Sequence, residues 1–269
     1  MGYSITDLQY LMSRLRDPET GCPWDLKQTP KSVIPYTLEE VYELVDAIEQ
    51  DDPAQVRQEL GDVLFQVIFY SQLASEQDTF RFSDVVNDIV EKLVRRHPHV
   101  FPDGTLESRR DVTAPDEADI KARWEDIKKK ERAQKSQYSV LDDIPLALPA
   151  LTRATKLQKR AAGMGFDWTE LKEVVCALRE ELLELEEAIH TGERTSIADE
   201  MGDVLFSAVN LSRHLGLDAE TTARHACAKF ERRFKFVEQR CTDMNVSEKS
   251  EDATRQMALF WNEAKATGL

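Results

Sequence analysis

The stretch "ELGDVLFQV" at residues 59–67 occurs a second time, as "EMGDVLFSA" at residues 200–208. Each copy opens with Glu-x-Gly-Asp, so two acids stand three positions apart at the head of an apolar run. A period of about 3.6 residues puts such positions on one helix face, so the pattern predicts a helix that carries two carboxylates among core side chains. The duplication predicts a chain built from two related halves.

The repetition extends well beyond this stretch. At an offset of 141 residues, Glu40, Glu43, Glu59 and Asp62 correspond to Glu181, Glu184, Glu200 and Asp203. At an offset of 137 residues, Lys92, Arg96 and Trp124 correspond to Lys229, Arg233 and Trp261. A repeat unit of this length predicts tandem domains and excludes a short-period solenoid. We place the two domains at residues 1–134 and 145–269, with a linker at 135–144.

The composition is typical of an acidic, helical protein. The chain has 269 residues, of which 41% are hydrophobic and 32% charged, and its formal net charge is −15. Helical periodicity dominates, whereas alternating strand patterns are nearly absent, so we expect an all-α fold. The net charge argues against nucleic acid as a partner, because neutralising phosphates requires a basic surface.

Cysteine usage and the lack of long apolar runs indicate where the protein works. The cysteines stand at positions 22, 176, 227 and 241, and no two of them have the CxxC spacing of a zinc site. The N-terminus lacks the form of a signal peptide, and no apolar run approaches the ~18 residues of a membrane-spanning helix. We therefore expect a reducing, cytoplasmic location and no membrane partner.

Glu40 and Glu43 allow two interpretations. They share a helix face that points away from the apolar stripe at residues 38, 41, 45 and 48. A solvated surface explains them, as does a capping box from Thr37 to Glu40. The second half weakens the capping explanation, because Leu178, three residues before Glu181, cannot cap a helix.

Glu59 and Asp62 favour a functional site more strongly. Apolar side chains surround the helix from Leu60 to Tyr70, which is typical of a buried helix, and acids there are costly unless they are paired, protonated or bound to a cation. Gly61 and Gly202 each cost about 1 kcal/mol relative to alanine inside a helix, so we expect another group to approach the backbone closely there.

Carboxylates from two facing helices form an all-oxygen cluster, which suits Mg²⁺ or Mn²⁺. No His or Cys recurs at corresponding positions of the two halves, so zinc is not expected. Mg²⁺ in proteins often also binds substrate phosphates. The basic pairs Lys92/Arg96 and Lys229/Arg233 either contact such phosphates or form ordinary exposed helix faces.

These residues resemble the MazG family of nucleoside triphosphate pyrophosphohydrolases, which carry an EExxE…ExxD motif. Here the motif reads Glu39-Glu40-x-x-Glu43…Glu59-x-x-Asp62, and again Glu180-Glu181-x-x-Glu184…Glu200-x-x-Asp203. The stretches "RLRDPETGCPWD", "RRHPHVF", "LDDIP" and "KFERRF" also look like parts of long, two-domain members. The resemblance covers nearly the whole chain. It implies tandem helical domains. Since one copy has few long helices with which to cover its apolar acid-bearing helix, we expect neighbouring copies, within or between chains, to pack into four-helix-bundle units, with a homodimer as the expected assembly.

The resemblance also implies an activity: Mg²⁺-dependent cleavage of an NTP or dNTP, ATP among them, to the monophosphate and pyrophosphate. The metal ligands would be Glu40, Glu43, Glu59, Asp62, Glu181, Glu184, Glu200 and Asp203. The nucleotide contacts would be Lys92, Arg96, Trp124, Lys229, Arg233 and Trp261. Glu39 and Glu180 would orient or deprotonate the attacking water. This chain departs from the family at Ala177 and Ser196, near which members can carry lysines.

Two other functions fit parts of the pattern. A non-enzymatic tandem helical interaction protein explains the acidic faces and the repeat, but not acids on an apolar helix. A di-iron carboxylate bundle requires a Glu-x-x-His motif from each of two helices. Such a motif occurs once, at Glu187 and His190, without a counterpart in the first half.

The two halves differ beside the acid helix. The second has Ser207, Ala208 and Asn210 where the first has Gln66, Val67 and Phe69. These side chains are smaller and more polar in the second half, and the amide of Asn210 can form hydrogen bonds with the edge of a base. We therefore expect residues 145–269 to hold the more active site.

Overall fold

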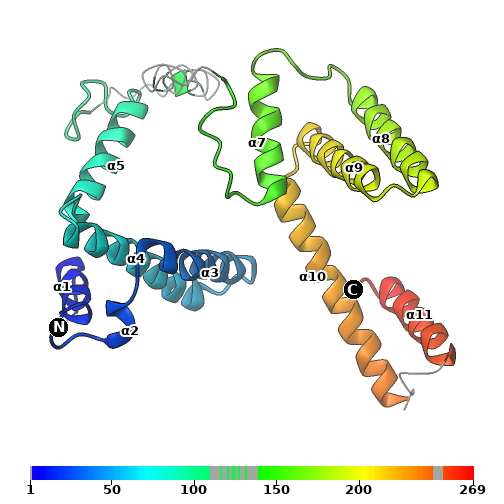
Figure 1. Cartoon of the computed structure of the whole chain (residues 1–269), viewed down its shortest axis with the longest axis horizontal. Coiled ribbons are helices and arrows are strands. Elements are labelled where there is room, and N and C mark those ends of the chain that lie inside the picture. The colour runs from blue at the N-terminus through cyan, green and yellow to red at the C-terminus, as the bar shows by residue number, and fades with distance from the viewer. Residues whose placement is uncertain are drawn as a thin grey trace. The chain divides into compact units, whose positions relative to one another are not determined.

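The computed structural model describes residues 2–109, 139–244 and 251–269, together with the single positions 116, 120, 123, 124, 127 and 131. The chain divides into two compact units, Met1–Lys129 and Lys130–Leu269. Within the described residues every regular element is a helix, so the expected all-α fold is confirmed (Figure 1). Residues 135–138 of the predicted linker at 135–144 lie outside the described residues, and the bounds of the linker stay a prediction.

The first unit is built around a helical hairpin. Its helices are α1 (Ile5–Leu15), α2 (Pro23–Leu26), α3 (Pro30–Glu49), α4 (Pro53–Glu76) and α5 (Phe82–Arg96). Thr29 caps α3 in a capping box with Ser32, and Asp52 caps α4 just before Pro53. These caps satisfy free backbone N–H groups and fix where each arm of the hairpin begins. The arms α3 and α4 pack together, and α1 packs against α4.

The second unit repeats the order of α1, α3, α4 and α5. Its helices are α7 (Ala150–Ala162), α8 (Leu171–Thr191), α9 (Arg194–His214), α10 (Ala219–Asp243) and α11 (Glu251–Ala266). Gly192 ends α8 with φ of 74°, a conformation that glycine adopts without strain, and so allows the turn into α9. The α8–α9 hairpin therefore corresponds to α3–α4. Helix α7 packs on α9 as α1 packs on α4, and α11 lies along α10 (Figure 1).

The two units bury different side chains. The core of the first joins Met12, Val33, Ile68, Phe69 and Leu73, all at most 3% exposed. The second has a smaller buried cluster of Ala154, Val209 and Ala219. Large side chains fill the space beside α4, whereas small ones stand at the matching place beside α9. This difference leaves room for a cavity in the second unit.

The apolar stripe of the first acid-bearing helix is largely exposed. Leu38, Val41 and Ile48 are 41–54% exposed, whereas Val33 and Ala47 on the same helix are buried. Glu40 lies between these two positions on the interior side and is half-buried. The capping explanation for Glu40 fails, because Thr37 lies in the middle of α3 and its hydroxyl donates to the Val33 carbonyl.

Among the described residues, the other acid-bearing helix is covered on one side only. Leu60, Leu64 and Val67 are 38–52% exposed and form an apolar face of α4. A Cβ added at Gly61 or Gly202 would meet nothing within 4 Å, so the expected close approach to the backbone is absent from the described part of the chain. Each hairpin therefore presents an open apolar face next to its acids.

In the parts of the chain that are described, no helix has both the length and the apolar character needed to cross a membrane.

Candidate active site

Three carboxylates converge in each hairpin. In the first unit, α3 supplies Glu40 and Glu43, α4 supplies Glu59, and one oxygen of each lies within 4.8 Å of the others. The second unit repeats the arrangement with Glu181 and Glu184 from α8 and Glu200 from α9, again within 4.8 Å. Six of the eight predicted ligands thus lie in two groups of three.

Burial and mutual repulsion raise the pKa of carboxyl groups in both clusters. Burial raises the pKa of Glu40, and the negative charge of Asp62 raises it further, followed by those of Glu43 and Glu59. Burial likewise raises the pKa of Glu181, followed by the charges of Asp203 and Glu184. Asp62 and Asp203 therefore act on the clusters although they lie outside the groups of three. An all-oxygen set with this repulsion fits a hard divalent cation.

Glu39 and Glu180, the predicted water-orienting acids, are exposed at the edges of the clusters. The charge of Glu180 is the smallest of the contributions that raise the pKa of Glu181, after burial and the charges of Asp203 and Glu184. Both side chains can reach solvent, as a residue that positions a water must.

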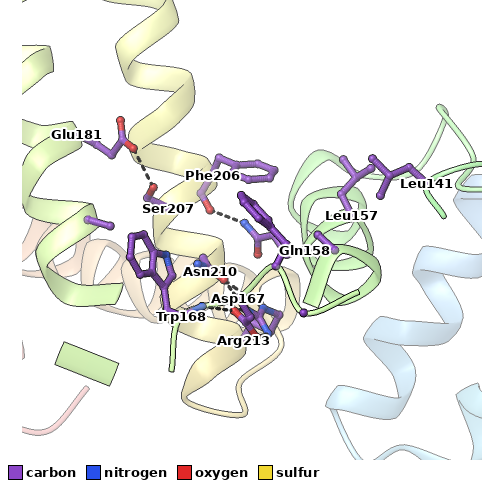
Figure 2. Close-up of a pocket in the computed structure, with 14 residues that line it drawn as sticks. Leu141, Leu157, Gln158, Asp167, Trp168, Glu181, Phe206, Ser207, Asn210 and Arg213 are labelled. Atoms are coloured by element: carbon purple, nitrogen blue, oxygen red, sulfur yellow. Dashed lines mark hydrogen bonds and ion pairs between the residues drawn. The ribbon is translucent and has the colours of Figure 1, made fainter. Parts of the chain in front are cut away.

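A cavity of about 560 Å³ opens beside the second cluster. Its walls are mostly apolar, with the rings of Trp168 and Phe206 among them (Figure 2). Glu181 and Ser207 also line it, and the Ser207 hydroxyl donates to the Glu181 carboxylate over 3.4 Å. The cavity thus meets the carboxylate cluster at Glu181, and its volume suits a nucleoside-sized ligand.

One end of the cavity holds a network of charged and amide groups (Figure 2). The Arg213 guanidinium makes a bidentate ion pair with Asp167, in which Nη1 donates to Oδ2 over 2.9 Å. Its hydrogen bonds lower the pKa of Asp167 to about 2, so this carboxylate is ionised at any physiological pH. Arg213 also donates to Asn210 from two nitrogens, over 3.1 and 2.7 Å.

The first unit carries larger side chains at two of the matching positions. Phe69 stands where the second unit has Asn210, is 2% exposed, and meets Phe65 edge-on with ring centroids 6.0 Å apart. Tyr36 stands where the second unit has Ala177, and its ring lies 5.4 Å from that of Trp24. Aromatic rings thus occupy the positions that line the cavity in the second unit.

The predicted basic residues lie in other helices. Lys229 and Arg233 are on α10, where the Arg233 guanidinium stands 6.0 Å from the ring of Trp261 on α11. Helix α11 packs on α10, whereas α8 packs on α9, so this group is in a different hairpin from the acids (Figure 1). In the first unit Lys92 and Arg96 lie on α5, and the Trp124 ring is 5.7 Å from that of His97.

Several cavity residues were missed by sequence reasoning. Gln158, Asp167 and Arg213 come from α7, from the segment after it and from the end of α9, and none has a matching residue type in the first half. Within the cavity lining, the sequence pointed to Ser207 and Asn210, through their contrast with Gln66 and Phe69.

The fold and site define a class: tandem all-α proteins in which each helical hairpin gathers carboxylates. The MazG nucleotide pyrophosphohydrolase domain matches residues 28–101 and 170–237, one match in each half and each containing a complete acid motif. The chain belongs to the MazG family, and the resemblance inferred from the sequence is confirmed.

Two relatives show how far the likeness extends. An Escherichia coli K12 protein named nucleoside triphosphate pyrophosphohydrolase is 52% identical over 236 residues, which are 87% of either chain. A Thermotoga maritima protein named nucleoside triphosphate pyrophosphohydrolase/pyrophosphatase MazG is 42% identical over 238 residues, which are 88% of this chain and 87% of that protein.

Proposed function

We propose that this protein is a divalent-metal-dependent hydrolase that cleaves nucleoside triphosphates to the monophosphate and pyrophosphate. The observation that carries the proposal is the second carboxylate cluster, whose Glu181 also lines a nucleoside-sized cavity. A nucleotide with its base in the cavity has its phosphates directed toward the carboxylates. The names of the two relatives agree with this activity.

The acids fit Mg²⁺ or Mn²⁺, because their ligand atoms are all carboxylate oxygens that repel one another. We propose that Glu181, Glu184, Glu200 and Asp203 hold the ion in the second unit, and Glu40, Glu43, Glu59 and Asp62 in the first. A bound Mg²⁺ would supply charge neutralisation for the triphosphate. Glu180 and Glu39 would accept a proton from the water that attacks the α-phosphorus, with pyrophosphate as the leaving group.

The remaining nucleotide contacts divide by chemistry. Asn210 lines the cavity and would contact the base. Lys229, Arg233, Lys92 and Arg96 carry the positive charge that phosphate oxygens require, and Trp261 and Trp124 offer rings for stacking. Since these residues lie in hairpins other than those of the acids, their contact with a substrate bound at the acids of the same chain stays a prediction.

A pyrophosphate-release assay over the eight common NTPs and dNTPs tests the function. With Mg²⁺ we expect equal amounts of monophosphate and pyrophosphate, and with EDTA no release. Added Mg²⁺ or Mn²⁺ in excess of the chelator should restore turnover. Orthophosphate as the first product would contradict cleavage at the α-phosphorus, and no release from any nucleotide would favour the non-enzymatic interaction protein.

We further propose that the protein is a homodimer. The α3–α4 hairpin exposes Leu60, Leu64 and Val67, and the α8–α9 hairpin exposes Met201 and Leu205 at 44–53%. Two helices cannot cover such a face on their own, whereas a second hairpin completes a four-helix bundle. Both the other hairpin of the same chain and a second copy of the chain carry such faces, and we propose that the second copy supplies the covering hairpins.

Light scattering at micromolar concentration is expected to give about twice the mass of one chain. A Leu64→Glu/Leu205→Glu variant places charge on both apolar faces and should shift the protein toward the monomer. A wild-type protein that is monomeric at these concentrations contradicts the dimer.

We propose a cytoplasmic location as well, because none of the four cysteines forms a disulfide and a reducing compartment keeps them so.

A further inference from the structure

The side chain of Asn210 can adopt only one amide orientation. Its Oδ1 receives hydrogen bonds from Nε and Nη2 of Arg213, over 3.1 and 2.7 Å. Arginine is a donor without acceptor atoms, so the Asn210 atom that faces it must be the oxygen. The amide nitrogen is therefore left over, and within the described residues it donates no hydrogen bond. Asn210 presents an N–H donor to the cavity (Figure 2).

The guanidinium that fixes Asn210 is itself held in place. Asp167 accepts from both of its terminal nitrogens, and His214 Nε2 lies 3.0 Å from Asp167 Oδ1. The Arg213 side chain is 12% exposed and that of Asp167 is 27% exposed, so the pair is partly shielded from water. A carbonyl that accepts two hydrogen bonds from a cation is strongly polarised, which makes the N–H of the same amide a better donor.

Gln158 has the opposite polarity. Its Nε2 donates to the Phe206 carbonyl over 2.9 Å, and because a carbonyl only accepts, this assignment is also fixed by chemistry. Its Oε1 is buried without a hydrogen-bond partner, and the whole residue is 8% exposed. A buried acceptor left without a donor is destabilising, so a ligand that brings an N–H is favoured here.

We propose that this cavity selects bases that present a keto edge. On this assignment, which rests on the proposed function, Asn210 Nδ2 donates to a ring carbonyl and Gln158 Oε1 accepts from a ring N–H. Arg213 and Asp167 are positioning residues that fix the donor. Guanine, hypoxanthine, uracil and thymine carry such an edge, whereas adenine and cytosine replace the carbonyl with an amino group. Trp168 and Phe206 provide rings against which a base can stack.

An amino group at the position of the carbonyl would meet the Asn210 N–H with another donor. Two donors face to face leave both hydrogen bonds unmade, and sites of this kind discriminate strongly.

Two substrate pairs isolate this feature: ITP against ATP, and UTP against CTP. Each pair shares a ring system and differs in its keto or amino edge. The reference protein and every variant in this experiment also carry Glu59→Gln/Asp62→Asn, so that the measured turnover comes from the second unit. The wild-type second unit is expected to favour the keto member of each pair by at least about tenfold in kcat/KM.

Asn210→Asp keeps the shape but presents a carboxylate oxygen, an acceptor, to the cavity. The keto-to-amino ratio is the kcat/KM of the keto substrate divided by that of the amino substrate. In both pairs this ratio should fall by at least about tenfold, and KM should change more than kcat. Arg213→Met removes the group that orients the Asn210 amide, so that the amide can rotate by 180° and offer either its N–H or its oxygen. Both ratios should then approach one. Arg240→Gln is the matched control, because it removes another guanidinium–carboxylate pair of the same unit, with Glu263 at 3.4 Å. That variant should keep the wild-type ratios.

If a variant turns over too slowly to measure, the ratios are taken from dissociation constants of α,β-methylene UTP and CTP. Keto-to-amino ratios of one or less in the wild type, or ratios unchanged by Asn210→Asp, overturn the proposal. Those results leave the proposed function intact, because pyrophosphate would still be released. If none of the nucleotides releases pyrophosphate, the proposed function itself is refuted.

Discussion

The Glu200→Gln/Asp203→Asn protein is expected to lose pyrophosphate release by about 100-fold or more, whereas Glu59→Gln/Asp62→Asn should keep most of it. Each double substitution removes two negative charges from one cluster at nearly constant side-chain shape. Loss of carboxylate ligands weakens metal binding and with it the neutralisation of the triphosphate. The two variants are chemically identical changes at matching positions of the repeat, so each is the control for the other.

The expected asymmetry does not come from the acids. Both halves gather three glutamates within 4.8 Å, and both keep the aspartate of the motif. It comes from the space beside them: the second cluster adjoins a cavity of about 560 Å³, whereas Phe69 is packed into the core of the first unit. A base bound in this cavity lies next to Glu181, whereas in the described part of the first unit the position that matches Asn210 is taken by the buried ring of Phe69.

The comparison requires full-length protein assayed on several NTPs with saturating Mg²⁺, and circular dichroism to establish that both variants are folded. Removing mutually repelling charges should leave the metal-free fold at least as stable as the wild type. The opposite ranking, in which the first-unit variant loses most of the turnover, would assign the activity to residues 1–134.

The repeat and the helical class are predictable because both depend on local patterns. Two offsets, 141 and 137, align residues of the two halves in the amino-acid sequence, and the matching helices α5 and α10 follow the second of them. The convergence of Glu40, Glu43 and Glu59 follows from spacing along two adjacent helices, since a short turn forces α3 and α4 to be antiparallel neighbours.

The direction in which each helix faces is not predictable from periodicity. The stripe of Leu38, Val41 and Ile48 has the spacing of a core face, yet in one chain it is exposed while Glu40 faces the hairpin interior. Hydrophobic spacing identifies a face that is to be covered, but not whether the cover comes from the same chain or from another. The homodimer is proposed for this reason.

The cavity is beyond the reach of sequence patterns. Gln158 meets the Phe206 carbonyl across 48 residues of chain, and Arg213 meets Asp167 across 46. Such contacts depend on how α7 packs on α9, and neither Gln158 nor Arg213 recurs in the first half to mark it. The contrast between Asn210 and Phe69 is visible in the sequence, but the ion pair that orients Asn210 is not.

Filling the cavity with the residues of the first half should remove the activity without touching the acids. Ala177→Tyr/Asn210→Phe introduces two rings at positions that line the cavity and that hold Tyr36 and Phe69 in the first unit. We expect kcat/KM for every NTP to fall by about 100-fold, mainly through KM, because the base loses its space and the amide donor. The affinity of the second cluster for Mg²⁺ should stay unchanged, since Glu181, Glu184 and Glu200 are kept.

Ala208→Val is the matched control for this exchange. It is also a substitution of a second-half residue by its first-half counterpart on the same helix, but Ala208 does not line the cavity. Its kcat/KM should stay within about twofold of the wild-type value, as is usual for sites with no special contacts. Overpacking by the two rings can cost about 1–3 kcal/mol, so melting curves of both variants accompany the kinetics. If the folded Ala177→Tyr/Asn210→Phe protein turns over NTPs like the wild type, the base does not bind in this cavity, and the asymmetry of the two halves must have another origin.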